Sequence, residues 1–307
     1  MKHQAKPVLK WVGGKTQLLD TLVPLVTLAA TPEGAKKPEP FRCYYEPFFG
    51  GGSVFFRLYE EGLFQKAVVN DINPVIFNFY EKLKEDPDGI ANYVDEFKAL
   101  GLNRENYAYI RDLECFSETQ AAAKTLYLNK TCFNGLYRVN KAGKFNVPWN
   151  KREEVTFYDI MTMRACAKAL DKAKILNKDF VEVTRSAKAG DFVYYDPPYA
   201  PVSKTSSFNN YAKEGFDWED QIRVFEEFDR LAKLGVNVML SNSDTWGLRD
   251  LFKDYRIETV KARRNVNSKG TKRGKVNEIL VLGGPMANQQ PLEEFASEAL
   301  TLQSAGF

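Results

Sequence analysis

The sequence Asp196-Pro197-Pro198-Tyr199 places an acid, two constrained carbonyl groups and an aromatic ring directly after the apolar segment Phe192 to Tyr195. Consecutive prolines lack N–H donors and keep the preceding residues extended, so the carbonyl groups here have no helix or sheet partner. The Asp196 carboxylate and the Pro197 carbonyl could accept both hydrogens of an aromatic amine and free the lone pair of its nitrogen. Tyr199 could stack on the ring that carries this amine. The motif predicts an amine placed in line with a sulfonium methyl group, and a structural proline turn is the alternative.

A second motif reads EPFFGGGS at residues 46–53, between a predicted strand and a predicted helix. Open α/β sheets bind ligands at the carboxyl ends of their strands, and glycines such as Gly50 and Gly52 let a ligand approach the backbone closely. Asp71 follows about twenty residues later, at the end of the next predicted strand, where it could accept both hydroxyls of a ribose. Because Val54 and Phe55 replace the third glycine of a dinucleotide motif, the pattern favours an adenosyl group without phosphates. A structural tight turn is the other interpretation.

Histidine occurs once, as His3 near the chain start. A Ser-His-Asp triad, a Cys-His pair, a histidine general base and a His-liganded catalytic metal are therefore excluded unless His3 folds inward. The amine chemistry above needs no histidine, because a methylated cationic amine is acidic and can lose its proton to Asp196 or to water. No metal is expected.

The cysteines and the apolar segments bear on the cellular compartment. The four cysteines are scattered without a C-x-x-C pair, so neither a disulfide framework nor a zinc site is indicated. Leu18 to Ala30 is apolar, but Asp20 interrupts it and a glycine turn precedes it, which favours a core helix over a signal peptide. No run is long enough to span a membrane. We expect a cytoplasmic protein.

Apolar strands alternate with helices on both sides of a central interruption, which predicts a doubly wound α/β sheet in a split domain. We assign residues 1–73 and 156–290 to the catalytic domain, 74–155 to an inserted, mainly helical domain and 291–307 to a peripheral tail. Helices are expected at Leu18–Ala30, from about Ser53, and at Val75–Lys84, Ile90–Leu100, Thr119–Lys130 and Asp217–Leu234. Strands are expected at Arg42–Glu46, Lys66–Asn70, Lys174–Leu176, Phe192–Tyr195, Asn237–Ser241, Ile257–Ala262 and Glu278–Leu282.

Taken together, these motifs resemble those of the Dam-type, or alpha-class, DNA adenine-N6 methyltransferases over nearly the whole chain. The matching segments, in the family's order, are LKWVGGK at 9–15, EPFFGGGSVF at 46–55, NGLYR at 134–138, GKFNVP at 143–148 and DPPY at 196–199. Ser241-Asn242 and Ala262-Arg263-Arg264 also have family-like settings. The resemblance implies a Rossmann-like S-adenosylmethionine-dependent methyltransferase sheet, with the insert as a DNA target-recognition domain.

The resemblance also implies roles for individual residues toward the cofactor S-adenosyl-L-methionine. Lys15 is expected to pair with its carboxylate, Trp11 and Phe48 to pack around it, and Asp71 to hold its ribose. Asp179 and Phe180 match the acid-aromatic pair that holds its adenine. The full expected set is Trp11, Lys15, Phe48, Gly50, Gly52, Asp71, Asp179, Phe180 and Asp196, and the catalytic set is Asp196, Pro197, Pro198 and Tyr199.

Double-stranded DNA is the partner that the resemblance implies, with adenine flipped out of the helix for methylation. The residues assigned to DNA by position are Lys10, Phe133, Asn134, Leu136, Arg138 and Pro148. Phe133 stands where the family commonly has tyrosine, and it keeps the stacking face. Two stretches without acids, 130–152 and 261–275, carry six and seven basic residues, which suits phosphate binding, although such runs are commonly solvated faces. The expected target is GATC, with related sites such as GATATC as alternatives.

Two other functions compete with this one. A methyltransferase that acts on protein glutamine or on RNA more often carries Asn-Pro-Pro-Tyr and lacks both the N-terminal motif and the recognition insert. A DNA-binding module that keeps the fold without turnover would not need Lys15, Asp71 and Asp196, which are all present. The sequence favours neither alternative, and it leaves the oligomeric state open.

Overall fold

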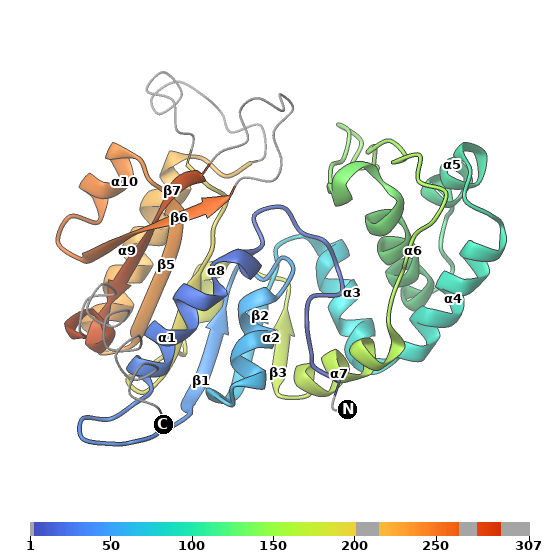
Figure 1. Cartoon of the computed structure of the whole chain (residues 1–307). Helices are drawn as coiled ribbons and strands as arrows, with labels where there is room; N and C mark the ends of the chain where they lie inside the picture. Colours follow the sequence, from blue (N-terminus) through green and yellow to red (C-terminus); the bar gives the residue numbers. More distant parts are fainter. Residues whose placement is uncertain (1–2, 201–214, 264–274, 290–307) are drawn as a thin grey trace.

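A seven-stranded sheet with the order β3-β2-β1-β4-β5-β7-β6 runs through the computed structural model, which describes residues 3–200, 215–263 and 275–289 (Figure 1). Strands β1 to β5 pair in parallel, and β7 lies antiparallel between β5 and β6. All seven predicted strands and the α/β class are confirmed. The strands are β1 (Phe41–Glu46), β2 (Phe64–Asn70), β3 (Ala173–Leu176), β4 (Phe192–Tyr195), β5 (Asn237–Ser243), β6 (Arg256–Arg263) and β7 (Lys275–Gly283).

The direction in which the chain winds reverses between β1 and β4, which are neighbours in the sheet. At such a switch point the loops after two adjacent parallel strands diverge and leave room for a ligand at the carboxyl edge. The glycine motif follows β1 and the Asp-Pro-Pro-Tyr motif follows β4. The topology therefore brings the two motifs to one place.

Both faces of the sheet are covered, because successive side chains of a strand point to opposite faces. Tyr44 and Tyr194 belong to the core that contains helices α1 and α2, whereas Tyr45 and Tyr195 belong to the core under α9. Every residue of β4 and β5 is buried, as expected for central parallel strands. The helices of this domain are α1 (Leu19–Ala29), α2 (Ser53–Glu60), α7 (Ile160–Leu170), α8 (Phe180–Thr184), α9 (Trp218–Lys233) and α10 (Trp246–Leu251), with short helices η1 (Lys15–Gln17) and η4 (Gly284–Asn288).

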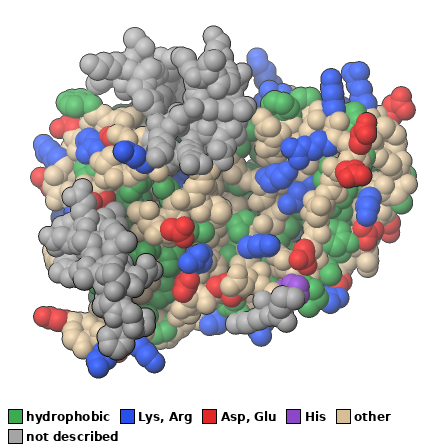
Figure 2. Space-filling model, viewed as in Figure 1, with side chains coloured by type: hydrophobic (Ala, Val, Ile, Leu, Met, Phe, Trp, Pro, Cys, Tyr) green, Lys and Arg blue, Asp and Glu red, His purple; other side chains and the backbone are tan. Residues whose placement is uncertain are grey.

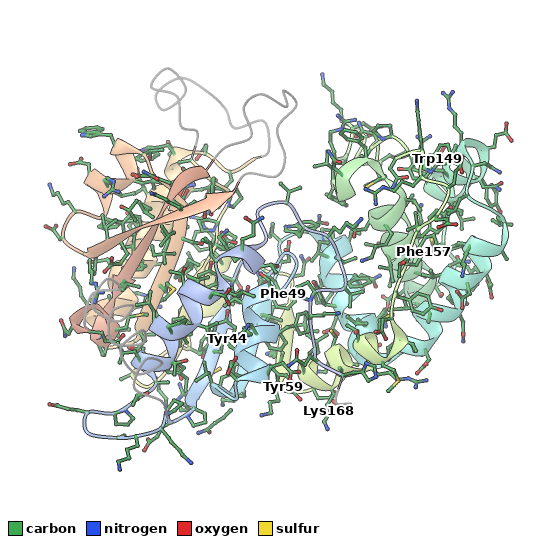
Figure 3. All side chains as sticks on the ribbon, viewed as in Figure 1. Tyr44, Phe49, Tyr59, Trp149, Phe157 and Lys168 are labelled. Atoms are coloured by element: carbon green, nitrogen blue, oxygen red, sulfur yellow. The ribbon has the colours of Figure 1, made fainter. Side chains whose placement is uncertain are left out.

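The stretch between β2 and β3 forms a group of helices beside the β3 edge of the sheet (Figure 1). It contains α3 (Pro74–Glu85), α4 (Pro87–Ala99), α5 (Arg104–Asp112), α6 (Glu118–Thr131) and η2 (Phe133–Gly135). Figure 3 shows Trp149 within this insert, Phe157 beside its helices, and Tyr44 and Phe49 in the sheet domain. One continuous apolar core includes residues of both parts, so the insert packs firmly against the sheet domain.

The predicted helices are confirmed, and the sequence analysis missed α5, α7, α8 and α10. Each of the four begins with a capping residue that could have revealed it, because the side chains of Asn103, Asp159, Asp179 and Thr245 accept hydrogen bonds from backbone N–H groups in the first turn. The expected core helix at 18–30 is α1, which buries Leu22, Leu25 and others. Within the described ranges, no helix combines the length and apolarity needed to cross a bilayer. The expected peripheral tail, 291–307, lies outside the described residues.

Candidate active site

The Asp196 carboxylate lies at the carboxyl end of β4, where two side chains from distant parts of the chain hold it. The Lys15 ammonium donates to Asp196 Oδ1 at 2.6 Å, and the Ser241 hydroxyl donates to the same oxygen at 3.1 Å. Ser241 is itself 2.7 Å from the Tyr194 hydroxyl. Burial raises the pKa of Asp196, and Lys15 and Ser241 act against that rise. The carboxylate is therefore fixed at one oxygen.

Buried amides hold the backbone that follows Asp196. Gln221 Nε2 donates to the Pro198 carbonyl at 2.8 Å, and Ala200 N–H donates to Asn242 Oδ1 at 3.2 Å. Asn242 Nδ2 also donates to Gln221 Oε1 at 3.1 Å, which joins the two amides. The Pro197 carbonyl receives no hydrogen bond from any residue in the described ranges. As the sequence predicted, it is an acceptor without an internal partner, next to a carboxylate.

Tyr199 completes the motif, and its ring is held at two points. Its hydroxyl donates to Glu278 Oε2 at 2.6 Å, and the Lys15 ammonium lies 4.8 Å from the ring centre. Burial, together with the Asp196 and Glu278 carboxylates, raises the pKa of Tyr199 far above the usual phenol value. The hydroxyl is therefore a donor at all physiological pH values.

The glycine turn is locked to the acid that follows β2. Gly50 N–H donates to Asp71 Oδ2 at 2.9 Å, and Asp71 Oδ1 accepts from Asn73 N–H at 2.9 Å. Burial raises the pKa of Asp71, and these two backbone donors act against the rise. Each carboxylate oxygen has a second lone pair, so the hydrogen bonds leave acceptor capacity for hydroxyl groups.

Gly50 was expected to let a ligand approach the backbone, but in the structure it makes room for a side chain. Its φ of +48° favours glycine, and a Cβ there would lie 2.6 Å from the Trp11 indole. The close approach that Gly50 permits is thus made by Trp11, a predicted cofactor-site residue. Gly52, at φ +67°, similarly admits the Phe49 ring.

Glu46, the first residue of the glycine motif, is a buried acid that the sequence analysis did not single out. It accepts the Tyr44 hydroxyl at 2.8 Å and is 3 % exposed. Burial raises the pKa of Glu46 to about 8, with the nearby Asp196 charge adding to the effect and the Tyr44 hydrogen bond opposing it. Near neutral pH, Glu46 is therefore mainly protonated, and Asp196 is not repelled by a second full charge.

The pair Asp179-Phe180 lies at the same edge of the sheet, after β3. It was expected to hold the adenine of the cofactor, but both residues already have partners within the chain. Both Asp179 oxygens have partners, because Oδ1 accepts from Val181 N–H at 3.0 Å and Oδ2 pairs with Arg223 at 2.7 Å. Phe180 packs on Phe48, with ring centres 5.3 Å apart, and the Arg223 guanidinium lies 4.8 Å from the Phe180 ring centre. The predicted role of this pair stays a prediction.

The predicted DNA-contacting residues lie together where the N-terminal segment meets the end of α6. Lys10 N–H donates to Asn129 Oδ1, and the Lys10 side chain lies against Gly135, between Asn134 and Leu136. Phe133 is 52 % exposed, and its N–H donates to the Pro148 carbonyl at 2.8 Å. Phe133 and Pro148 are thus neighbours, and the Phe133 ring is exposed to solvent, as its predicted role requires.

Arg138 is held in place within this loop. Its Nε and one terminal nitrogen donate to the side chain and carbonyl of Asn146, at 2.7 and 3.0 Å. Short antiparallel bridges, Cys132 with Trp149 and Val139 with Phe145, close the loop. The Tyr137 ring lies 6.0 Å from the Trp11 ring, so the loop reaches the glycine turn. Figure 2 shows Lys and Arg side chains gathered on the upper part of the insert.

The basic stretches need one correction. The Lys130 ammonium donates to the Val8 carbonyl at 2.6 Å, and burial lowers the pKa of Lys130 to about 8. Lys130 therefore supports the fold and is not free to bind a phosphate, whereas Lys141, Lys144 and Lys151 of the same stretch are exposed. Most of the second stretch, residues 264–274 with the family-like Arg264, lies outside the described residues.

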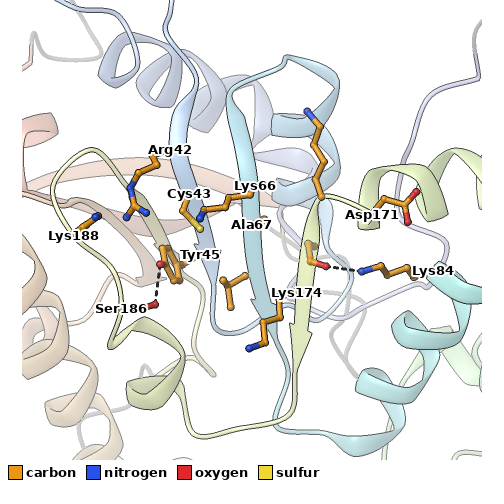
Figure 4. Close-up of a pocket in the computed structure, with 13 residues that line it drawn as sticks. Arg42, Cys43, Tyr45, Lys66, Ala67, Lys84, Asp171, Lys174, Ser186 and Lys188 are labelled. Carbon is orange, nitrogen blue, oxygen red and sulfur yellow. Dashed lines mark hydrogen bonds between the residues drawn. The ribbon is translucent and has the colours of Figure 1, made fainter.

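A cavity of about 650 Å³ opens elsewhere, on a face of β1, β2 and β3 (Figure 4). Several of its basic side chains already have partners: Arg42 pairs with Asp191, and Lys84 donates to the Ala173 carbonyl at 2.9 Å. It contains none of the motif residues. The chemistry therefore belongs to the carboxyl edge of the sheet.

Comparison with known proteins shows the family to which the chain belongs. A family model described as D12 class N6 adenine-specific DNA methyltransferase matches residues 11–266. The chain belongs to this family. It is 36 % identical over 288 residues to the Type II methyltransferase M1.LlaDCHI of Lactococcus lactis subsp. cremoris, covering 91 % of this chain and 96 % of that one.

The chain also matches two further relatives over nearly their whole length. The Type II methyltransferase M.MjaIII of Methanocaldococcus jannaschii is 37 % identical over 294 residues, covering 91 % of this chain and 99 % of that one. The DNA adenine methylase of Escherichia coli K12 is 32 % identical over 283 residues, covering 90 % and 95 %. This D12-class enzyme is therefore an adenine-specific DNA methyltransferase that uses S-adenosyl-L-methionine, as the sequence predicted.

The residues at the edge of the sheet fit that cofactor. Asp71 keeps free lone pairs for hydroxyl groups, and the buried Lys15 and the partly exposed Asp196 offer one group of each sign for an amino acid moiety. Three residues that complete the site were missed by the sequence analysis: Glu46, Gln221 and Glu278. Only Glu46 carried a signal, because it opens the glycine motif, whereas the other two come from distant elements.

Proposed function

We propose that this D12-class methyltransferase takes an adenine out of double-stranded DNA and methylates its N6 within GATC. The observation that carries the proposal is the pair of acceptors at the end of β4. The Asp196 carboxylate is anchored by Lys15 and Ser241, and the Pro197 carbonyl beside it has no hydrogen bond from the described residues. An adenine amine has two hydrogens to donate, and this pair can accept both.

The two acceptors make the amine reactive. When bound, S-adenosyl-L-methionine supplies an electrophilic methyl group on a sulfonium centre. Hydrogen bonds from the amine to Asp196 and Pro197 draw its nitrogen toward a pyramidal form whose lone pair is free. Lys15 and Ser241 leave Asp196 Oδ2 without a partner among the described residues, so this oxygen is the acceptor for the amine and for the proton that it later releases.

The surrounding residues orient the two reactants. Tyr199 stacks on the flipped base, while Pro197 and Pro198 keep the backbone extended. The cofactor would be held by Trp11, Lys15, Phe48, Gly50, Gly52, Asp71, Asp179, Phe180 and Asp196. Because Asp179 is paired with Arg223, adenine recognition there would use the remaining lone pairs of its carboxylate.

DNA recognition is assigned to the insert, residues 74–155, together with Lys10. Phe133 is exposed at the end of α6 and can fill the space that a flipped base leaves. The guanidinium of Arg138 keeps donors beyond the two used by Asn146, so it can read a base edge. Asn134, Leu136 and Pro148 contribute the other base contacts. The choice of GATC rests on the resemblance of loop 134–148 to the family's recognition loop.

Sequencing that detects N6-methyladenine tests reaction and target together. Unmethylated genomic DNA would be incubated with the enzyme and the cofactor, with a cofactor-free reaction as the control. The proposal predicts N6-methyladenine at GATC only. Methylation confined to a related site such as GATATC would overturn the target sequence, and transfer to RNA or protein but not to DNA would overturn the substrate. The proposal includes a cytoplasmic, DNA-associated location, where the enzyme meets its DNA substrate.

A further inference from the structure

Glu278 is a buried carboxylate that the chemistry described above does not use. It lies in β7 opposite Ser243 of β5, and it is 9 % exposed. Within the described ranges its carboxylate has a single hydrogen-bond partner, the Tyr199 hydroxyl at 2.6 Å, and no ion pair. Burying a carboxylate costs free energy unless it is well paired. A buried acid in β7, a strand that lies between two others in the sheet, therefore calls for a role that an apolar side chain could not fill.

We propose that Glu278 is a positioning residue that sets the orientation of the Tyr199 ring against the target base. This inference rests on the proposed stacking role of Tyr199. The ring is linked to Glu278 through its hydroxyl, and the Lys15 ammonium lies 4.8 Å from its centre. Because Lys15 occupies one side of the ring, the target base stacks on the other side.

The backbone around Tyr199 is fixed as well, which leaves the side chain as the part that needs anchoring. The carbonyl of the preceding residue, Pro198, accepts a hydrogen bond from Gln221. The following residue, Ala200, is hydrogen-bonded to Asn242 and Ser243. Ser243 Oγ donates to the Ala200 carbonyl at 2.7 Å, directly beside the strand position of Glu278. The edge of β5 and β7 thus holds both the backbone and the hydroxyl of Tyr199.

The hydrogen bond has the character of a strong one. Oxygen–oxygen distances of about 2.5–2.7 Å are typical of a hydroxyl that donates to a carboxylate. The phenol keeps its proton throughout the physiological pH range, so it is a permanent donor to Glu278. Without the acceptor, the ring could turn about its two side-chain torsions and carry the stacked base with it.

Small changes in the position of the base matter for methyl transfer. An in-line displacement needs the nitrogen within about 3–3.5 Å of the methyl carbon, and a misplacement of about 1 Å can cost about 100-fold in rate. We therefore expect loss of the Glu278 link to lower the rate constant of methyl transfer by about tenfold or more. The affinity for DNA should change little, because Glu278 contacts Tyr199 and not the DNA.

Four variants test the inference: Glu278→Ala, Glu278→Gln, Tyr199→Phe and the double variant Glu278→Ala with Tyr199→Phe. Glu258→Gln is the matched control, because Glu258 lies on the adjacent strand β6 and pairs with Arg256. The rate constant is measured in single turnovers with saturating DNA and cofactor. The fluorescence of 2-aminopurine at the target position reports how the flipped base is stacked.

Glu278→Ala and Tyr199→Phe should slow transfer to a similar extent and change the 2-aminopurine signal alike. The double variant should be no slower than either single variant, because both remove one interaction. Glu278→Gln, which keeps an acceptor, should restore much of the rate, and Glu258→Gln should match the wild type.

Additive losses in the double variant would overturn the inference. So would a wild-type rate and signal in Tyr199→Phe, which removes the same hydrogen bond even if Glu278→Ala fails to fold. Either result would leave the proposed function intact, whereas a wild-type enzyme that forms no N6-methyladenine in DNA would overturn both.

Discussion

The Lys15 ammonium lies 2.6 Å from the Asp196 carboxylate, although the two residues are 181 positions apart in the chain. Lys15 is 3 % exposed, and Asp196 is 19 % exposed. The contact joins the N-terminal segment to the Asp-Pro-Pro-Tyr motif across the glycine turn, because Lys15 N–H also donates to Ser53 at the start of α2. Lys15 thus links the N-terminal segment, the end of the glycine motif and the Asp-Pro-Pro-Tyr motif.

Replacing Lys15 should change the pH dependence of catalysis. Burial raises the pKa of Asp196, and Lys15 is the main influence against that rise. In Lys15→Met the pKa of Asp196 should rise further. On acidification, Asp196 of this variant should therefore become protonated at a higher pH than in the wild type. The acid limb of the kcat profile, measured with saturating DNA and cofactor, should therefore move to higher pH.

The matched control for that experiment is Lys98→Met, on the exposed side of α4. It should leave the acid limb where it is in the wild type. The test is the position of the acid limb and not the magnitude of kcat, since Lys15 is also a proposed cofactor-binding residue. An acid limb that stays in place or moves to lower pH would contradict the assignment of Asp196 as the essential carboxylate.

Replacing Glu46 should change the pH dependence of stability. Its pKa is raised to about 8 in the folded chain, above the usual glutamate value, so folding favours its protonated form. Its contribution is then fully present below the unfolded pKa and is lost as the pH rises toward about 8, at up to about 1.4 kcal/mol per pH unit. Glu46→Gln cannot ionise and should lose less stability over this range.

Urea unfolding at about pH 5 and about pH 8.5 measures this difference as the free energy of unfolding. Glu61→Gln is the control, because Glu61 is exposed at the end of α2 and pairs with Arg57. If the wild type and Glu46→Gln lost the same stability between the two pH values, Glu46 would be ionised in the fold and the electrostatic account of the site would need revision.

Arg138 should determine which base pair the enzyme accepts at one position of its target site. A guanidinium that reads a base edge contributes about 1–3 kcal/mol of discrimination, so Arg138→Ala should relax the site by that amount at one position. Asn146→Ala should give a smaller loss at the same position, because Asn146 only orients Arg138. The measurement is kcat/KM over a panel of DNA duplexes, each with one altered base pair.

Lys141→Ala provides the contrast, because Lys141 is an exposed residue of the same loop. As a phosphate contact it should weaken activity on all duplexes by a similar factor. Unchanged discrimination in Arg138→Ala across the panel would remove Arg138 from the recognition set.

The sequence predicted those features that depend on local patterns. Apolar runs marked the seven strands, and Asp71 and Asp196 were found because each directly follows a strand. Parallel strands end at one edge, so placing the motifs after β1, β2 and β4 was enough to bring them together. The expected residues of the glycine turn and of Asp-Pro-Pro-Tyr indeed lie at this edge.

Features that depend on long-range partners could not be predicted. Gln221 and Glu278 reach the motif from α9 and β7, and no spacing in the sequence connects them with Pro198 or Tyr199. Lys130 was assigned to a basic stretch suited to phosphate binding, but in the folded chain its ammonium donates to the Val8 carbonyl. Such residues have no local signal, because their environment is set by which elements become neighbours.

The central claim is that the Asp196 carboxylate activates the adenine amine, and Asp196→Ala tests it most directly. Transfer of a labelled methyl group from S-adenosyl-L-methionine to DNA is measured beside the affinity of the same variant for that DNA. The account predicts that methyl transfer is abolished while most of the DNA affinity remains, because the proposed recognition loop lies on a separate element from β4. Methyl transfer at the wild-type rate by Asp196→Ala would contradict it.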